Sequence, residues 1–131
     1  MPGPLSFSKL VLIVDDDDGS LELLEFLVKS EGFMAQGAMD GATALDKVKS
    51  LKPDLVVLDL MLPRYGGFEV LRRMQQDREA SRIPIIVVSG RYTEPMTVEV
   101  IKQEPNVKDF FAKPVPQDLF KAALHRILRP S

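Results

Sequence analysis

Short apolar runs that do not alternate with polar residues constrain the fold of this chain more than any other feature. Leu10–Val14, Leu55–Leu58 and Ile83–Val88 are rich in Val, Ile and Leu, which predicts strands buried on both faces. Val107–Ala112 is a fourth candidate strand and Phe33–Gly37 is a fifth. Because strands of this kind need cover on both sides, we expect the intervening segments to supply helices.

The intervening segments do have the apolar spacing of amphipathic helices. A shorter helix is expected near Glu94–Gln103, with Pro95 in its first turn and Pro105 beyond its end. Strand and helix therefore alternate five times, which predicts one α/β domain with a parallel sheet, helices on both faces and right-handed connections. The longer helices are expected from four apolar stripes: Leu21, Leu24 and Val28 with Leu23 and Leu27 beside them; Ala44, Leu45, Val48 and Leu51; Phe68, Leu71 and Met74; and Leu119, Ala123, Leu124, Ile127 and Leu128.

The composition of the chain excludes several classes of function. The 131 residues include 17 Lys and Arg against 19 Asp and Glu, a net charge of −2, so a broad basic surface for nucleic acid is not expected. The absence of Cys excludes thiol catalysis and Cys-ligated metal sites. No apolar run approaches the roughly 18–20 residues of a membrane span, and the N-terminus lacks a secretory signal pattern. We therefore expect a cytoplasmic protein that binds neither nucleic acid nor membrane.

Polar side chains of complementary types follow four of the predicted strands. Asp15–Asp18 follow the first, Asp59 the third, Ser89 the fourth, and Lys113–Pro114 the fifth. In open parallel sheets, ligands bind beyond the carboxyl ends of the strands, so these groups are expected to converge. An acidic run is often only a solvated turn or a helix cap, and Asp18 is expected to cap the first helix. Their occurrence at four strand ends together favours a functional site.

The residue types at these strand ends suggest phosphoryl chemistry. Crowded carboxylates require either that one binds a proton or that a metal ion neutralises them. Oxygen ligands without His or Cys favour Mg²⁺, with Mn²⁺ as the alternative. A nearby Lys and Ser can contact phosphoryl oxygens, and an Asp can serve as a covalent acceptor. The sequence therefore predicts a site that holds or transfers a phosphoryl group.

From about Lys9 to Leu128 the chain resembles the receiver domains of two-component response regulators. The resemblance implies a flavodoxin-like (βα)5 fold with strand order 2-1-3-4-5, a receiver domain over residues 9–129, an extension over 1–8 and a tail over 130–131. Five motifs in the family's order carry it: Leu12–Asp16, Pro53–Pro63, Gly67–Leu71, Ile83–Gly90 and Phe110–Pro114.

The resemblance also implies roles for individual residues. Asp59 would accept the phosphoryl group from a histidine kinase or a phosphotransfer protein. Asp16 and Asp59 would ligate Mg²⁺ together with the backbone carbonyl of Met61, and Asp15 would act through a metal-bound water. The protein would then be a signalling switch, and it would catalyse only its own phosphorylation and dephosphorylation.

The resemblance also implies that the conformational switch involves the last two strands. Ser89 and Lys113 would bind phosphoryl oxygens, and Phe110 would turn inward as Ser89 is drawn toward the phosphate. The surface of the fourth helix, fifth strand and fifth helix would then engage a downstream output domain or protein, or a second copy of the chain. The Lys113–Pro114 bond is expected to be cis. The segment Arg91–Lys108 departs most from the family, so the family's dimer geometry is not carried over.

Two other functions fit these residues less well. A degenerate receiver that serves only as an interaction module is disfavoured because Asp15, Asp16, Asp59, Ser89 and Lys113 are all present. A haloacid-dehalogenase-like phosphatase would need a second Asp two positions after Asp59, where this chain has Met61. Nucleotide-binding glycine loops are absent.

Overall fold

The computed structural model describes residues 9–62, 66–90 and 95–128. The predicted extension over 1–8 and tail over 130–131, together with Pro63, Arg91 and Glu94, lie outside the described residues. In chain order the elements are β1 (Leu10–Val14), α1 (Asp18–Ser30), β2 (Met34–Ala38), α2 (Gly41–Leu51), β3 (Leu55–Asp59), α3 (Gly67–Gln76), the 3₁₀ turn η2 (Ala80–Arg82), β4 (Ile85–Ser89), α4 (Pro95–Lys102), β5 (Val107–Ala112) and α5 (Gln117–Leu128).

The five strands form one parallel sheet in the order β2-β1-β3-β4-β5. This confirms the predicted doubly wound fold. The order reverses between β1 and β3, so the polar residues after these two neighbouring strands lie at the switch point of the topology. No helix within the described ranges is long and apolar enough to cross a membrane.

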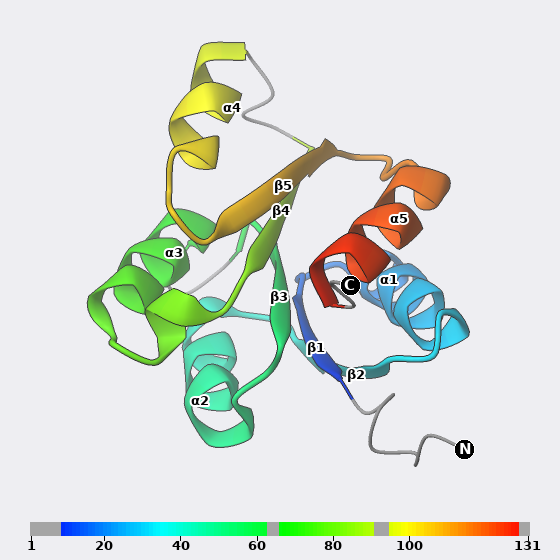
Figure 1. Cartoon of the computed structure of the whole chain (residues 1–131), viewed down its shortest axis with the longest axis horizontal. Helices are drawn as coiled ribbons and strands as arrows, with labels where there is room; N and C mark the ends of the chain where they lie inside the picture. Colours follow the sequence, from blue (N-terminus) through cyan, green and yellow to red (C-terminus); the bar gives the residue numbers. More distant parts are fainter. Residues whose placement is uncertain (1–8, 63–65, 91–94, 129–131) are drawn as a thin grey trace.

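Helices cover both faces of the sheet, as Figure 1 shows. On one face α2, α3 and α4 pack over a core that includes Leu58, Met74 and Ile101. On the other face α1 and α5 pack over a core that includes Ile13 and Phe120. β3 and β4 are buried along their whole length, because alternate residues of each strand point into the two cores. The residues paired with β3 in the sheet are all apolar. Asp59, the last residue of this buried strand, therefore lies at a fixed position at the carboxyl edge of the sheet.

Several predicted details were wrong, and each has a local cause. Asp17, not Asp18, caps α1: its side chain accepts the N–H of Ser20 at 2.8 Å. Leu119 and Phe68 are exposed, although both were predicted to lie on apolar stripes. The other members of the predicted stripes do face the core, apart from the half-buried Ile127: they are Ala123, Leu124 and Leu128 on α5 and Leu71 and Met74 on α3. Phe120 and Val70 are buried beside them in place of Leu119 and Phe68.

Two strands begin one or two residues later than the sequence predicts. β2 begins at Met34 because Phe33 belongs to the turn that follows α1, where its N–H donates to the carbonyl of Val28. β4 begins at Ile85, since Ile83 ends the 3₁₀ turn η2 and Pro84 has no N–H to give to the ladder. The Lys113–Pro114 peptide is cis, as the resemblance implied.

Candidate phosphoryl and metal site

Three aspartates converge at the carboxyl ends of β1 and β3. One carboxylate oxygen from each of Asp15, Asp16 and Asp59 lies within 4.8 Å of the other two. Asp15 is fully buried and Asp59 is 3% exposed, whereas Asp16 is open to solvent. The sequence prediction that these strand ends meet is confirmed. The site therefore has a buried side and an accessible side.

Lys113 binds both buried carboxylates. Its Nζ lies 2.8 Å from Asp15 Oδ2 and 2.8 Å from Asp59 Oδ2, although β5 is separated from β3 by the whole of β4. The sequence predicted Lys113 as a partner for a phosphoryl group. In the structure this side chain joins two acids that would otherwise repel each other, and the phosphoryl role stays a prediction.

Backbone N–H groups occupy the other oxygens of the two buried acids. Asp15 Oδ1 accepts the N–H of Asp17 at 3.0 Å, and Asp59 Oδ1 accepts the N–H of Met61 at 2.9 Å. These bonds hold each carboxylate against its own strand end. They fix the direction in which the remaining lone pairs point, which a catalytic or metal-binding carboxylate requires.

The site carries an unbalanced negative charge. Three carboxylates and one ammonium leave a formal charge of −2. Burial raises the pKa of Asp59, and the hydrogen bonds from Lys113 and from the Met61 N–H only partly oppose this rise. For Lys113, burial disfavours the charge, but the hydrogen bonds to Asp15 and Asp59 outweigh it and raise the pKa. A divalent cation would balance the charge that remains.

Ser89 and Phe110 lie on the adjacent strands. Ser89 ends β4 and is fully buried, and its carbonyl accepts the N–H of Lys113 at 2.9 Å. Phe110 lies opposite Val87 in the ladder, is half-buried, and packs against the core beneath α3 and α4. The structure therefore places Ser89 beside the strand end that carries Lys113, with Phe110 two residues further from the edge.

Gly67 also shapes the site, although its motif predicts no role for it. A Cβ built on it would lie 2.5 Å from the Asp59 carbonyl oxygen and 2.9 Å from the Leu60 carbonyl carbon. The start of α3 therefore packs directly on the backbone of Asp59. The Gly-Gly pair before the apolar stripe of α3 was the available signal.

Comparison with known proteins agrees with this geometry. A family model described as the response regulator receiver domain matches residues 11–125. The chain belongs to this family, and its function is that of a receiver domain in two-component response regulators.

Among curated relatives, the DNA-binding response regulator MtrA of Mycobacterium tuberculosis is 37% identical over 120 residues, which is 91% of this chain and 50% of that protein. The transcriptional regulatory protein PhoP of Bacillus subtilis, named for alkaline phosphatase synthesis, is 33% identical over 124 residues, 95% of this chain and 50% of that protein. The chain spans about half the length of these relatives.

Solved structures show the same fold. A response regulator from Chloroflexus aurantiacus superposes with a TM-score of 0.84 at 26% identity, covering 92% of this chain and 98% of that one. The receiver domain of the sensor histidine kinase PA1611 from Pseudomonas aeruginosa, solved with a magnesium ion in its active-site cleft, has a TM-score of 0.81 at 22% identity over 92% and 98% of the two chains. At that identity the second likeness concerns the fold alone.

Proposed function

We propose that Asp59 is the phosphoacceptor of this receiver domain. The observation that carries the proposal is the position of its carboxylate at the end of β3, held by the Met61 N–H on one oxygen and by Lys113 on the other. Asp16 adds an exposed carboxylate on the open side of the site. A donor phosphoryl group can reach the site from that side, while the buried side keeps the nucleophile in place.

The donor set fits a hard divalent cation. Asp16 and Asp59 would hold Mg²⁺ together with the backbone carbonyl of Met61, and Asp15 would contact it through a water; Mn²⁺ has the same ligand preference. When bound, the cation supplies charge neutralisation for an incoming phosphoryl group. Two observations support this assignment, the all-oxygen ligands and the formal charge of −2 that the cation would cancel.

The transfer step follows from these positions. A carboxylate oxygen of Asp59 forms a bond to phosphorus as the phosphorus–nitrogen bond of a phosphohistidine breaks, and the histidine ring keeps the electron pair and takes up a proton. The ammonium of Lys113, already 2.8 Å from Asp59 Oδ2, then stays close to the phosphoryl oxygens. Its raised pKa keeps it charged throughout, so its role is electrostatic and it transfers no proton.

Ser89 and Phe110 would convert this chemistry into a change of surface. The Ser89 hydroxyl would bond a phosphoryl oxygen, and Phe110 would move into the space beside it. Both residues belong to the β4–β5 ladder, so the change would be passed to α4, β5 and α5. Phosphorylation would in this way bias an equilibrium between two arrangements of that surface.

The proposed phosphoryl transfer also implies two classes of partner. A histidine kinase or phosphotransfer protein would donate the phosphoryl group, and an output domain or protein would bind the changed surface, with a phosphorylation-linked homodimer as one form of output. The protein would act in the cytoplasm as a switch whose chemistry is limited to gaining and losing its own phosphoryl group.

Incubation with acetyl phosphate and Mg²⁺, followed by intact mass measurement, tests the assignment. We expect one phosphoryl group that is stable in acid and labile in base, that is lost in Asp59→Asn, and that is retained in Asp18→Asn, an exposed aspartate outside the cluster. The same mass increase in Asp59→Asn would refute Asp59 as the acceptor. Mg²⁺ affinity measured by calorimetry should collapse in Asp16→Ala, and an unchanged affinity would exclude Asp16 as a ligand.

A further inference from the structure

β2 is held in the sheet by few of its own side chains. It forms one edge of the sheet and pairs only with β1 (Figure 1). The residues Met34–Gly37 are exposed or half-buried, and only Ala38 is buried. An edge strand has no second neighbour to bind its outer backbone groups. The position of β2 therefore depends on individual contacts at its two ends.

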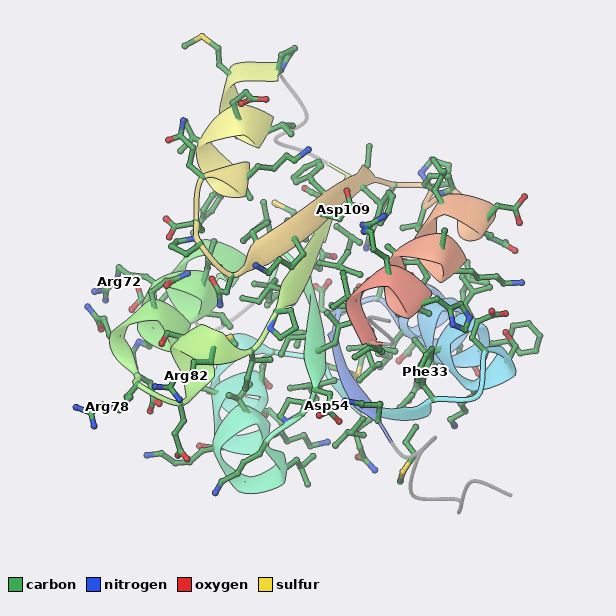
Figure 2. All side chains as sticks on the ribbon, viewed as in Figure 1. Phe33, Asp54, Arg72, Arg78, Arg82 and Asp109 are labelled. Atoms are coloured by element: carbon green, nitrogen blue, oxygen red, sulfur yellow. The ribbon has the colours of Figure 1, made fainter. Side chains whose placement is uncertain are left out.

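A buried aromatic ring anchors the amino end of β2. Phe33 directly precedes the strand, is 3% exposed, and has its ring centroid 5.4 Å from that of His125 on α5 (Figure 2). The next residue, Met34, donates its N–H to the carbonyl of Lys9 at 2.9 Å. This end of the strand is thus fixed both by burial and by the backbone that leads into β1.

The carboxyl end of β2 lacks a comparable anchor. A Cβ at Gly37 would lie 3.2 Å from both methyl carbons of Leu21, so α1 passes too close for a larger residue at this position. Ala38 is buried, but it contributes a single methyl group. A glycine inside a strand weakens the strand because it has no side chain to pack. Packing alone therefore holds this end of β2 weakly.

Lys47 of α2 supplies the missing contact. From a half-buried position its Nζ donates to the carbonyl of Gly37 at 2.6 Å. Adjacent residues of a parallel strand direct their backbone groups to opposite sides, and the Ala38 carbonyl is directed to β1, so the Gly37 carbonyl points away from the sheet. A hydrogen bond from a charged donor is stronger than one between neutral groups. Lys47 therefore ties the edge strand to α2.

The residue after Gly37 holds the backbone of the acidic site. The carbonyl of Ala38 accepts the N–H of Asp15 at 3.0 Å, directly beyond the point where the ends of β1 and β2 pair. Asp15 carries one of the buried carboxylates of the site, and Asp16 follows it in the chain. A displacement of the end of β2 would therefore move Asp15 first, and Asp16 with it.

We propose that Lys47 is a positioning residue for the phosphoryl and metal site. By holding the Gly37 carbonyl it fixes Ala38, and Ala38 in turn keeps Asp15 and Asp16 in place. This inference rests on the proposed role of the two aspartates in holding a divalent cation. Lys47 acts through the backbone of β2 and takes no part in the phosphoryl transfer itself.

Amide hydrogen exchange of the metal-free protein tests the contact without relying on phosphorylation. Lys47→Met keeps the length of the side chain and removes the donor. We expect exchange of the Asp15 N–H to accelerate about tenfold, the effect of losing one charge-assisted hydrogen bond. The N–H of Val57, in the buried strand β3, should exchange at the wild-type rate. Unchanged exchange at Asp15, or equal acceleration at Val57 through general destabilisation, would overturn the proposal.

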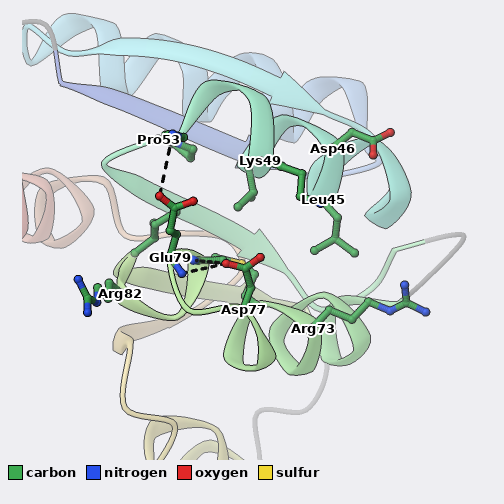
Figure 3. A pocket seen from close by; sticks show the side chains of 13 residues that line it. Leu45, Asp46, Lys49, Pro53, Arg73, Asp77, Glu79 and Arg82 are labelled. Carbon is green, nitrogen blue, oxygen red and sulfur yellow. Dashed lines mark hydrogen bonds and ion pairs between the residues drawn. The ribbon is translucent and has the colours of Figure 1, made fainter.

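Two further variants of α2 separate the hydrogen bond from the charge. Lys47→Arg retains a charged donor and should restore the slow exchange of Asp15. Lys49→Met is the matched control, because Lys49 faces away from Lys47 and lines the cavity between α2, α3 and η2 (Figure 3). It removes the same charge from the same helix and should leave the exchange of Asp15 unchanged. Equal acceleration in Lys49→Met would refute the assignment to the Gly37 contact.

Mg²⁺ affinity measured by calorimetry connects the contact to the site. Loss of a positive charge by itself favours cation binding, so Lys49→Met should leave the dissociation constant unchanged or slightly lower. Lys47→Met should instead raise it about tenfold, as is typical when a residue that positions metal ligands is lost. Equal affinities of the two variants would refute the positioning role. If the wild-type protein bound no Mg²⁺, the proposed function would fail, and the exchange of Asp15 would still decide whether Lys47 holds this end of β2.

Discussion

Substitution of Gly67 by alanine tests whether the start of α3 sets the position of the phosphoacceptor strand. The added Cβ would lie 2.5 Å from the Asp59 carbonyl oxygen and 2.9 Å from the Leu60 carbonyl carbon, with Leu60 Cα also too close. Unstrained carbon contacts need about 3.5–4.0 Å. All three atoms belong to the backbone, so no side chain can rotate to make room, and the helix must move away from the strand.

Two effects of opposite sign decide the magnitude. Replacing a glycine by alanine in a helix favours folding by about 0.5–1 kcal/mol. Overpacking against a fixed backbone costs about 2 kcal/mol, and a shift of α3 also strains the 3.1 Å hydrogen bond from the Gly67 N–H to the Leu60 carbonyl, worth about 1 kcal/mol. The clash prevails, and we expect a net loss of about 2 kcal/mol, or roughly 8 °C in Tm for a domain of this size.

Urea denaturation and thermal melting of Gly67→Ala measure this loss. Gly90→Ala is the matched control, because it also adjoins the site, yet a Cβ there has no atom of the described residues within 4 Å. We expect Gly90→Ala to change the free energy of unfolding by less than about 0.5 kcal/mol. A Gly67→Ala protein as stable as the wild type, or a control that loses as much, would show that α3 does not press on the Asp59 backbone.

Two pH-dependent predictions follow from the shifted carboxyls. Burial raises the pKa of Asp59 above its ordinary 3.8, so the proton-bound form is favoured in the folded state, and this contribution to stability is lost as the pH rises through the raised value. In the presence of a chelator, Asp59→Asn should therefore be more stable than the wild type at pH 7, by a margin that shrinks toward pH 3.8; equal stability at pH 7 would contradict the assignment. On α3, hydrogen bonds from Arg72 and Arg73 lower the pKa of Glu69 to about 2. The carboxyl carbon NMR shift of Glu69 should titrate near that value, and a midpoint close to 4.5 would show that these ion pairs are not maintained in solution.

The strands and the convergence of the site could be predicted because both depend on local sequence. In a doubly wound sheet, an apolar run such as Leu55–Leu58 fits only a strand that is buried on both faces. The residue that follows the run must then lie at the ligand-binding edge of the sheet. Asp59 and Lys113 were found in this way. No tertiary contact had to be known to place them at the same end of the sheet.

The errors concern features that depend on small rotations or on contacts across the fold. Asp17 and Asp18 are chemically identical, so only the backbone angles of the turn decide which of them caps α1. Leu119 and Phe120 are adjacent and both apolar, and a rotation of about 100° along the helix decides which is buried. The approach of Gly67 to Asp59 depends on the packing of α3: the Gly66–Gly67 pair indicates a tight turn, but it does not say which backbone the helix contacts.

The register of β5 explains why a change at one site can reach both faces of the sheet. Phe110 packs on the core beneath α3 and α4, whereas the next residue, Phe111, contacts Phe120 of α5 with ring centroids 6.2 Å apart. Ser89 and Lys113 are joined by a backbone hydrogen bond at the edge of the same ladder. A displacement drawn by a phosphoryl group at that edge would thus act first on β5, and α4 and α5 would respond through side chains that point to opposite faces of one strand.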